Sequence, residues 1–196
     1  VLVEHGKITA LENTGVLQAP AHAVRINCAE CTLLPGLIDS HVHLGAAGVA
    51  PWKPRLPTVP ETAEAFLYAG VTTVLVASHH LSREIELAEL GAKGEALTPH
   101  LFLAGQGLSP KHGHPVPISQ ALLPWPLSSI FPWFHRTADT PKEAIEAVQQ
   151  TAAECHPPFF KIFYDAIPPG SPHLDRDILS VSVKSAKDLG MRPVVH

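Results

Sequence analysis

The 196-residue chain is predicted to be an α/β protein in which a small β region precedes a parallel sheet. Two observations predict this class. Short apolar segments rich in β-branched residues alternate with helical segments of about 10 to 16 residues, which is the pattern of consecutive strand–helix–strand units. Polar side chains, many of them histidines, stand at the carboxyl ends of different predicted strands, where barrel enzymes place their active sites.

The first 34 residues are predicted to form short strands joined by turns. Apolar and polar residues alternate in VLVEHGKITAL, with a hairpin turn at Gly6-Lys7, and HAVRINCAECTLL (22–34) continues the β region. The C-A-E-C motif at Cys28 and Cys31 allows a redox or structural-metal role, but no second pair follows at zinc-ribbon spacing, so ordinary cysteines are favoured. An odd total of three cysteines argues against a disulfide framework and for a reducing compartment, the cytoplasm.

Strands and helices then alternate along the rest of the chain. Thr140, Pro141 and Glu143 mark the clearest helix start, with an N-cap, a proline at the first position and an acid in the first turn. Ser82 is the expected N-cap of an earlier helix. The predicted strands are 37–44, 71–78, 100–105, 158–166 and 192–196, the predicted helices are 63–70, 82–97, 140–155 and 175–190, and a proline-rich loop over 109–132 holds a short helical turn near 118–122.

Such a parallel sheet has two common arrangements, a doubly wound open sheet and a closed (β/α)8 barrel. No glycine-rich phosphate motif follows the first strand, which argues against the nucleotide-binding open sheet. Because the histidines follow the strands at their carboxyl ends, the barrel is the favoured prediction. Five of its eight strands are visible in the sequence, so the chain is expected to supply part of a barrel.

His41 and His43 flank a single valine in the apolar segment 37–44. Alternate residues of a strand point to the same face, so both imidazoles and Asp39 are expected on one face. Two adjacent imidazoles at a buried strand end are costly unless their nitrogens have partners. A divalent metal is one such partner, and backbone carbonyls of a neighbouring loop are the alternative.

Composition excludes several classes of protein. A hydrophobic fraction of 45% suffices for a core and argues against disorder. The net charge of -4 gives no basic surface for nucleic acid, and no apolar run approaches the roughly 20 residues of a membrane span. Neither nucleic acid nor a membrane is therefore an expected partner. The partner expected is a small-molecule substrate, and the full-length protein is expected to form homo-oligomers. The first residue is valine, which suggests that the natural N-terminus lies upstream.

The segment LLPGLIDSHVHL (33–44) closely resembles the first-strand signature of the metal-dependent amidohydrolase superfamily, and the similarity extends almost end to end. GKITAL resembles part of the β-sandwich domain that precedes the barrel in this family. This implies a domain boundary between residues 1–34 and 35–196. The third-strand segment LFLAGQGLSPKHGHP and the fourth-strand segment FFKIFYDA are similar to those of the imidazolonepropionase-like and dipeptidase-like branch.

The resemblance implies a metal centre, with zinc as the expected metal and one or two ions bound. His41 and His43 fall at the positions of ligands to the more buried ion, and His196 at that of a ligand to the second ion. Lys161 falls where many members carry a carboxylated lysine that bridges two metals. An isolated buried ammonium is unfavourable, which agrees with carboxylation, whereas a lysine that extends to solvent at the strand end is the alternative.

The implied activity is hydrolysis of an amide or other C–N bond, in a cyclic amide or a dipeptide-like substrate, by a metal-activated water. The family's sixth-strand histidine and eighth-strand aspartate have no counterpart in this sequence. The chain alone is therefore expected to be inactive, and none of its residues is assigned a catalytic role. A non-catalytic scaffold with the same fold is the alternative function, and a small redox protein built on Cys28 and Cys31 is a third.

Four further histidines are candidates for lining a substrate pocket or for solvated loop positions. They are His79, His80, His112 and His114.

Overall fold

The computed structural model describes residues 1–13, 15–28, 30–45, 57–78, 81–122, 125–126, 129 and 135–196. It divides into two compact units, Val1–Pro35 and Gly36–His196. The first unit contains an antiparallel hairpin of β1 (Leu2–Glu4) and β2 (Lys7–Ala10). The predicted hairpin is confirmed, with its turn one residue earlier, at His5 and Gly6, both of which have positive φ.

The predicted continuation of the β region over 22–34 is wrong for the residues that the structure describes there. These residues form turns and irregular backbone, and the apolar side chains among them are exposed, Val24 by 91% and Ile26 by 82%. Alternation of apolar and polar residues favours a strand only where a partner strand and an apolar surface are present. In the described part of this unit these side chains have neither.

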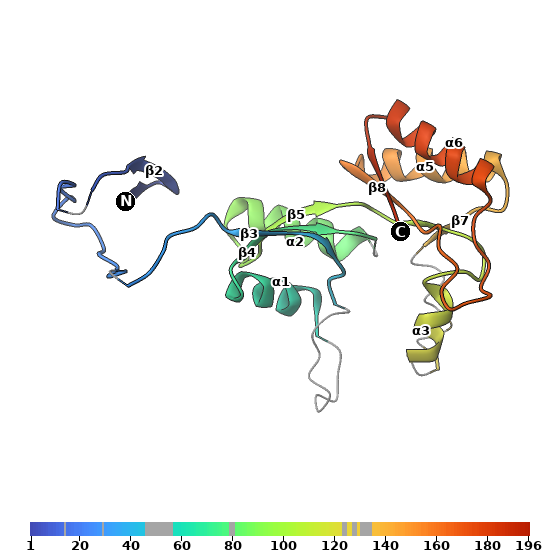
Figure 1. The fold of residues 1–196 in the computed structure, drawn as a ribbon, viewed down its shortest axis with the longest axis horizontal. Helices are drawn as coiled ribbons and strands as arrows, with labels where there is room; N and C mark the ends of the chain where they lie inside the picture. The colour runs from blue at the N-terminus through green and yellow to red at the C-terminus, as the bar shows by residue number, and fades with distance from the viewer. Residues whose placement is uncertain are drawn as a thin grey trace. The chain divides into compact units, whose positions relative to one another are not determined.

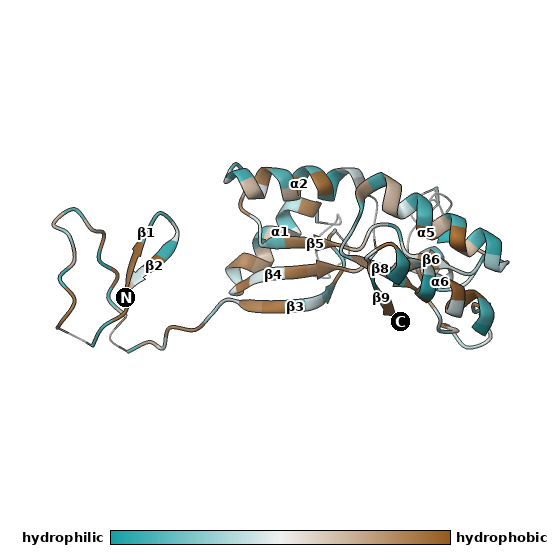
Figure 2. Ribbon diagram, turned by 90° about the horizontal axis from the view of Figure 1, so that it is seen from above, coloured by the Kyte–Doolittle hydropathy of each residue, from teal (hydrophilic) through white to brown (hydrophobic). Residues whose placement is uncertain are grey.

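The second unit begins with three parallel strands, β3 (Leu37–Val42), β4 (Val71–Val76) and β5 (His100–Leu103), in the order β3-β4-β5. Figure 2 shows these strands as mainly hydrophobic segments. Helices α1 (Val59–Tyr68) and α2 (Leu81–Lys93) connect them and pack on β4 and β5 respectively. A core of buried residues lies here, formed by Val42, Leu44, Val74 and Val76.

The starts of both helices differ from the prediction. α1 begins four residues before the predicted position, because Thr58 and Glu61 form a capping box and Pro60 occupies the first turn. Ser82, the predicted N-cap of the next helix, instead lies inside α2, since Leu81 already has helical conformation.

A second parallel sheet has the order β7-β6-β8-β9. Its strands are β6 (Leu108–Ser109), β7 (Arg136–Thr137), β8 (Phe159–Ile162) and β9 (Arg192–Val195), and the accompanying helices are α3 (Val116–Leu122), α5 (Pro141–Cys155) and α6 (Arg176–Asp188). Figure 1 shows α5 and α6 close to β8. The short strands β6 and β7 were not predicted, because two-residue strands carry no recognisable period.

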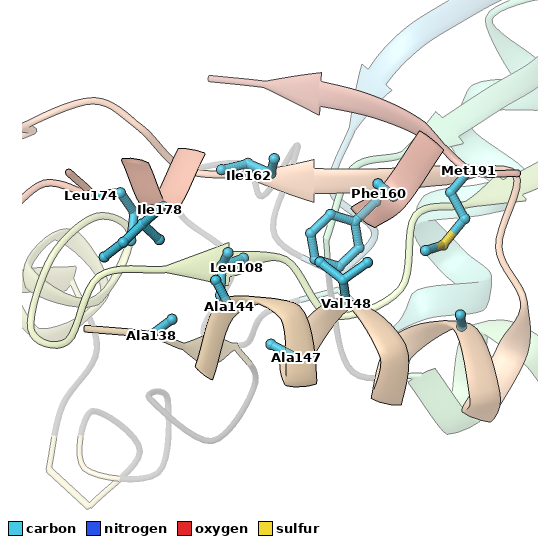
Figure 3. Close-up of a cluster of buried hydrophobic side chains, with 12 residues drawn as sticks. Leu108, Ala138, Ala144, Ala147, Val148, Phe160, Ile162, Leu174, Ile178 and Met191 are labelled. Carbon is cyan, nitrogen blue, oxygen red and sulfur yellow. The ribbon is translucent and has the colours of Figure 1, made fainter. Parts of the chain in front are cut away.

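The larger core lies between this sheet and its helices. Figure 3 shows Ala144 and Val148 of α5 facing Leu108 of β6 and Phe160 of β8. α5 starts where predicted, with a capping box between Thr140 and Glu143. Apolar residues at helical spacing therefore attach α5 to the strands, and the carboxyl ends of β6, β8 and β9 lie together at one edge of the sheet.

Candidate metal centre

His41 and His43 come together at the carboxyl end of β3. Their ring centroids are 5.4 Å apart in an edge-to-face arrangement. Val42 between them is buried in the apolar core, so the two imidazoles lie on the opposite face of the strand. The backbone N–H of His41 donates to the carboxylate of Asp39 at 3.0 Å, so this carboxylate already has a hydrogen-bond donor.

His196, which directly follows β9, reaches the same place. Its ring centroid is 5.7 Å from that of His41. Its backbone N–H donates to the carbonyl of Ile162 at 2.9 Å and so continues the pairing of β9 with β8. Three histidines from two distant strands therefore meet at one site.

Lys161 lies at the third position of β8 and is fully buried. Its Nζ has no hydrogen-bond partner among the described residues, and it lies 5.2 Å from the centroid of the Phe163 ring. Burial lowers the pKa of Lys161, and the negative charge of Asp165 acts in the opposite direction. The structure thus contains a buried amine with a weakened preference for its charged form.

Burial and the charge of Lys161 lower the pKa values of all three histidines. The carbonyl of Ser78 opposes this effect at His43, as does Asp165 at His196. A lowered pKa favours the neutral imidazole, which is the form that binds a metal. The lowered pKa values therefore favour the protonation state in which these imidazoles can bind a metal.

Ser78, just beyond β4, orients part of this site. Its carbonyl oxygen lies 3.2 Å from Nδ1 of His43, which directs the other ring nitrogen away from the backbone. Its hydroxyl accepts from the N–H of Gly107 at 3.0 Å and lies 3.2 Å from Nδ1 of His135. Ser78 has φ of 89°, unusual for a residue other than glycine. A Cβ at Gly107 would stand 2.8 Å from that hydroxyl, so glycine is required there.

His114 also reaches the site, whereas His112 does not join it. His114 is buried, its ring centroid is 4.9 Å from that of His196, and its Nδ1 lies 2.7 Å from the Oδ2 of Asp165. Ligand atoms of three residues lie within 4.8 Å of one another: His114, Asp165 and His196. His112 is exposed on the loop. His79 and His80 lie outside the described residues.

Asp165 is the site residue that the sequence reasoning missed. It stands four residues after Lys161, within the segment that carried the family resemblance. Its position just beyond a strand that bears a candidate ligand was the available signal.

Cys28 and Cys31 are exposed free thiols in the first unit. None of the described helices has the length and apolar character needed to cross a bilayer.

Two curated proteins are similar in sequence to this chain. The enamidase of Eubacterium barkeri is 31% identical over 100 residues, which are 50% of this chain and 24% of the enamidase. The allantoinase of Saccharomyces cerevisiae is 37% identical over 65 residues, which are 33% of this chain and 13% of the allantoinase. The matched part is thus a quarter or less of each relative's length. No known family model matches the chain.

The fold has counterparts among solved structures. A crystal structure of an amidohydrolase superposes with a TM-score of 0.66 and 23% identity, covering 92% of this chain and 47% of that one. The chain therefore has the mixed α/β fold found in amidohydrolases. The sequence similarity to the enamidase and the allantoinase, together with the shared fold, agrees with the resemblance of the first-strand motif to the amidohydrolase superfamily.

Proposed function

We propose that this chain contributes to a metal-dependent hydrolase that cleaves amide or other C–N bonds. The parallel strands β3, β4 and β5, followed by β6, β8 and β9, are proposed to be part of a (β/α)8 barrel, and the first unit part of a β-sandwich. The names of the two relatives, an enamidase and an allantoinase, support hydrolysis at the level of the family. The substrate class proposed is a cyclic amide or a dipeptide-like molecule.

The observation that carries this proposal is the convergence of His41, His43 and His196 near a buried lysine without a hydrogen-bond partner among the described residues. Imidazole and amine nitrogens that lack partners in a partly buried site are unfavourable, and a bound cation together with an anion would supply those partners. A divalent metal, proposed to be zinc, and a carboxylated Lys161 would supply both. The residues therefore fit the group that the family resemblance implies.

Carboxylation of Lys161 requires its neutral amine. The amine nitrogen adds to CO2, forms an N–C bond and releases one proton, which leaves an anionic carbamate. Burial lowers the pKa of Lys161 and so favours the reactive form. The carbamate oxygens are proposed to complete the ligand set with His41, His43 and His196.

The chain's own residues are proposed to bind the metal and to hold the ligand side chains in position. His41 and His43 present ring nitrogens from one strand face, and the carbonyl of Ser78 holds the His43 ring in one orientation. Phe163 borders the site with an apolar ring beside His196. When bound, the metal lowers the pKa of water and polarises the scissile carbonyl.

The test uses the natural protein that contains this chain, supplied with zinc and bicarbonate and assayed on amide and dipeptide panels. Lys161→Ala is expected to lower metal content and to reduce the hydrolysis rate by at least about a hundredfold, the upper range seen when metal sites are disturbed. His100→Ala is the matched control, because His100 lies at the amino end of β5 and is exposed. It should leave both quantities unchanged.

Two outcomes would contradict the proposal. A Lys161→Ala protein with full metal content and normal turnover would exclude the carbamate. A wild-type protein that purifies without metal and hydrolyses none of the panel would favour the non-catalytic scaffold.

A further inference from the structure

We propose that His114, Asp165 and His196 form a binding site for one divalent metal ion of the zinc type. The three residues come from separate segments, one before α3, one after β8 and one after β9. Because β6, β8 and β9 are parallel neighbours, the segments that leave their carboxyl ends share one edge of the sheet. Each residue contributes one ligand atom, and these atoms lie within 4.8 Å of one another.

The backbone around these residues is held by hydrogen bonds that extend beyond the strands. The N–H of Phe163 donates to the carbonyl of Leu108 at 2.8 Å, and the N–H of Tyr164 donates to the carbonyl of His196 at 3.2 Å. The Ser109 hydroxyl donates to the carbonyl of His114 at 2.8 Å. The ligand atoms are therefore placed by the sheet itself.

The contact between His114 and Asp165 is short but is not a hydrogen bond. Nδ1 of His114 lies 2.7 Å from Oδ2 of Asp165, yet neither atom has a hydrogen-bond partner among the described residues. A hydrogen bond requires the N–H to point at its acceptor, and this contact does not meet that requirement. Both carboxylate oxygens are buried without a hydrogen-bond donor, and Oδ2 forms an ion pair with His114 only when that imidazole is protonated. Such a carboxylate is unfavourable, and a cation shared with the imidazole would offset that cost.

The donor atoms select the kind of metal. Two imidazole nitrogens and one carboxylate oxygen form a ligand set that suits zinc and leaves a fourth position open. Calcium and magnesium prefer oxygen ligands. The ring of His114 is held edge-on by Phe163 at 5.2 Å and by His196 at 4.9 Å, so it is restricted to this arrangement.

This site deepens the proposed function, and it rests on that function in one respect, since His196 belongs to both ligand sets. His114 and Asp165 are proposed as further ligands, from this chain, to an ion at His196.

The experiment titrates the metal-free natural protein that contains this chain with zinc in competition with a chelator. Asp165→Asn and His114→Gln are expected to weaken one zinc site by at least about tenfold. His173→Gln is the matched control, because His173 is exposed and lies outside this group, and its zinc affinity should equal that of the wild type. The double variant His41→Gln, His43→Gln should retain the site.

The variants separate the two proposals. If Asp165→Asn and His114→Gln bind zinc as the wild type does, this inference is wrong, and loss of binding in the His41, His43 double variant would then support the earlier ligand set. If the double variant binds normally while Asp165→Asn does not, this site stands and the earlier set fails. Should the variants misfold, ¹⁵N NMR of the wild-type imidazoles decides. Zinc should shift the His114 and His196 ring signals, and unchanged signals at saturating zinc would overturn the proposal.

Discussion

Two ionisable side chains, Lys161 in β8 and Glu84 in α2, are buried in different surroundings. Lys161 in β8 is fully buried beside three histidines, and its isolation is the strongest sign of a functional site. Glu84, in the first turn of α2, is only 4% exposed. Burial raises the pKa of Glu84 to about 7, while its backbone hydrogen bond and Arg83 act in the opposite direction. The folded chain therefore favours a protonated Glu84 in mildly acidic solution.

Glu84 is expected to make stability depend on pH. Its pKa is higher in the folded state, about 7, than the ordinary value of 4.5, so its stabilising contribution is complete below pH 4.5 and is lost as the pH rises through 7. Glu84→Gln should remove this slope and raise the free energy of unfolding at pH 8 by about 1 to 3 kcal/mol. Urea unfolding at pH 5 and pH 8 measures it. The exposed Glu86→Gln should keep the wild-type slope, and an unchanged slope in Glu84→Gln would refute the assignment.

At the scale of elements, the helices differ in how they begin. α1 and α5 both start with a threonine N-cap, a proline and a glutamate that completes a capping box. α6 starts at Asp175, whose side chain makes no cap hydrogen bond. Amphipathic helices in this chain therefore begin either with a capping box, as in α1 and α5, or without a side-chain cap hydrogen bond, as in α6. Of the two capping boxes, only that of α5 was predicted from residue types, whereas α1 was predicted to begin four residues too late.

Thr140→Ala is expected to destabilise the chain by about 1 kcal/mol, because the Glu143 N–H loses its acceptor. Asp175→Ala should cost less, since no cap hydrogen bond is lost there. Thermal unfolding followed by circular dichroism compares the two. Equal losses would mean that the capping box of α5 contributes nothing specific.

Considering the whole molecule, both sheets of the second unit have an edge strand near the site. β3 pairs with β4, β9 pairs with β8, and neither has a second partner among the described strands. Leu37 and Ile38 of β3 are 58% and 74% exposed, and Val195 of β9 is 47% exposed. Strand edges with apolar side chains are surfaces on which further strands pair.

The 196-residue chain is therefore expected to self-associate. Sedimentation velocity should show species larger than a monomer, and Ile38→Lys should shift the distribution toward monomer by placing a charge on the β3 edge. Tyr68→Lys is the control, because Tyr68 is 97% exposed but lies at the end of α1. A wild-type chain that sediments as a monomer would contradict this expectation.

Most elements of the second unit were predictable because their signals are local. The β-branched run of β4 and the capping residues of α5 specify their conformations within a few residues. The strand proposed over 22–34 failed because a strand needs a partner, and the segment itself contains no information about one. β6 and β7 are too short for any period to be visible.

The sequence by itself determined most elements of the second unit and the spacing that places His41 and His43 on one strand face, and its first-strand motif indicated a resemblance to the amidohydrolase superfamily. Tertiary structure alone decided which residues meet them. That His196 lies beside His41, that Lys161 has no hydrogen-bond partner among the described residues, and that Asp165 contacts His114 all depend on the pairing of strands distant in the chain. The physical reason is that conformation follows from neighbours in sequence, whereas burial and electrostatic coupling depend on neighbours in space.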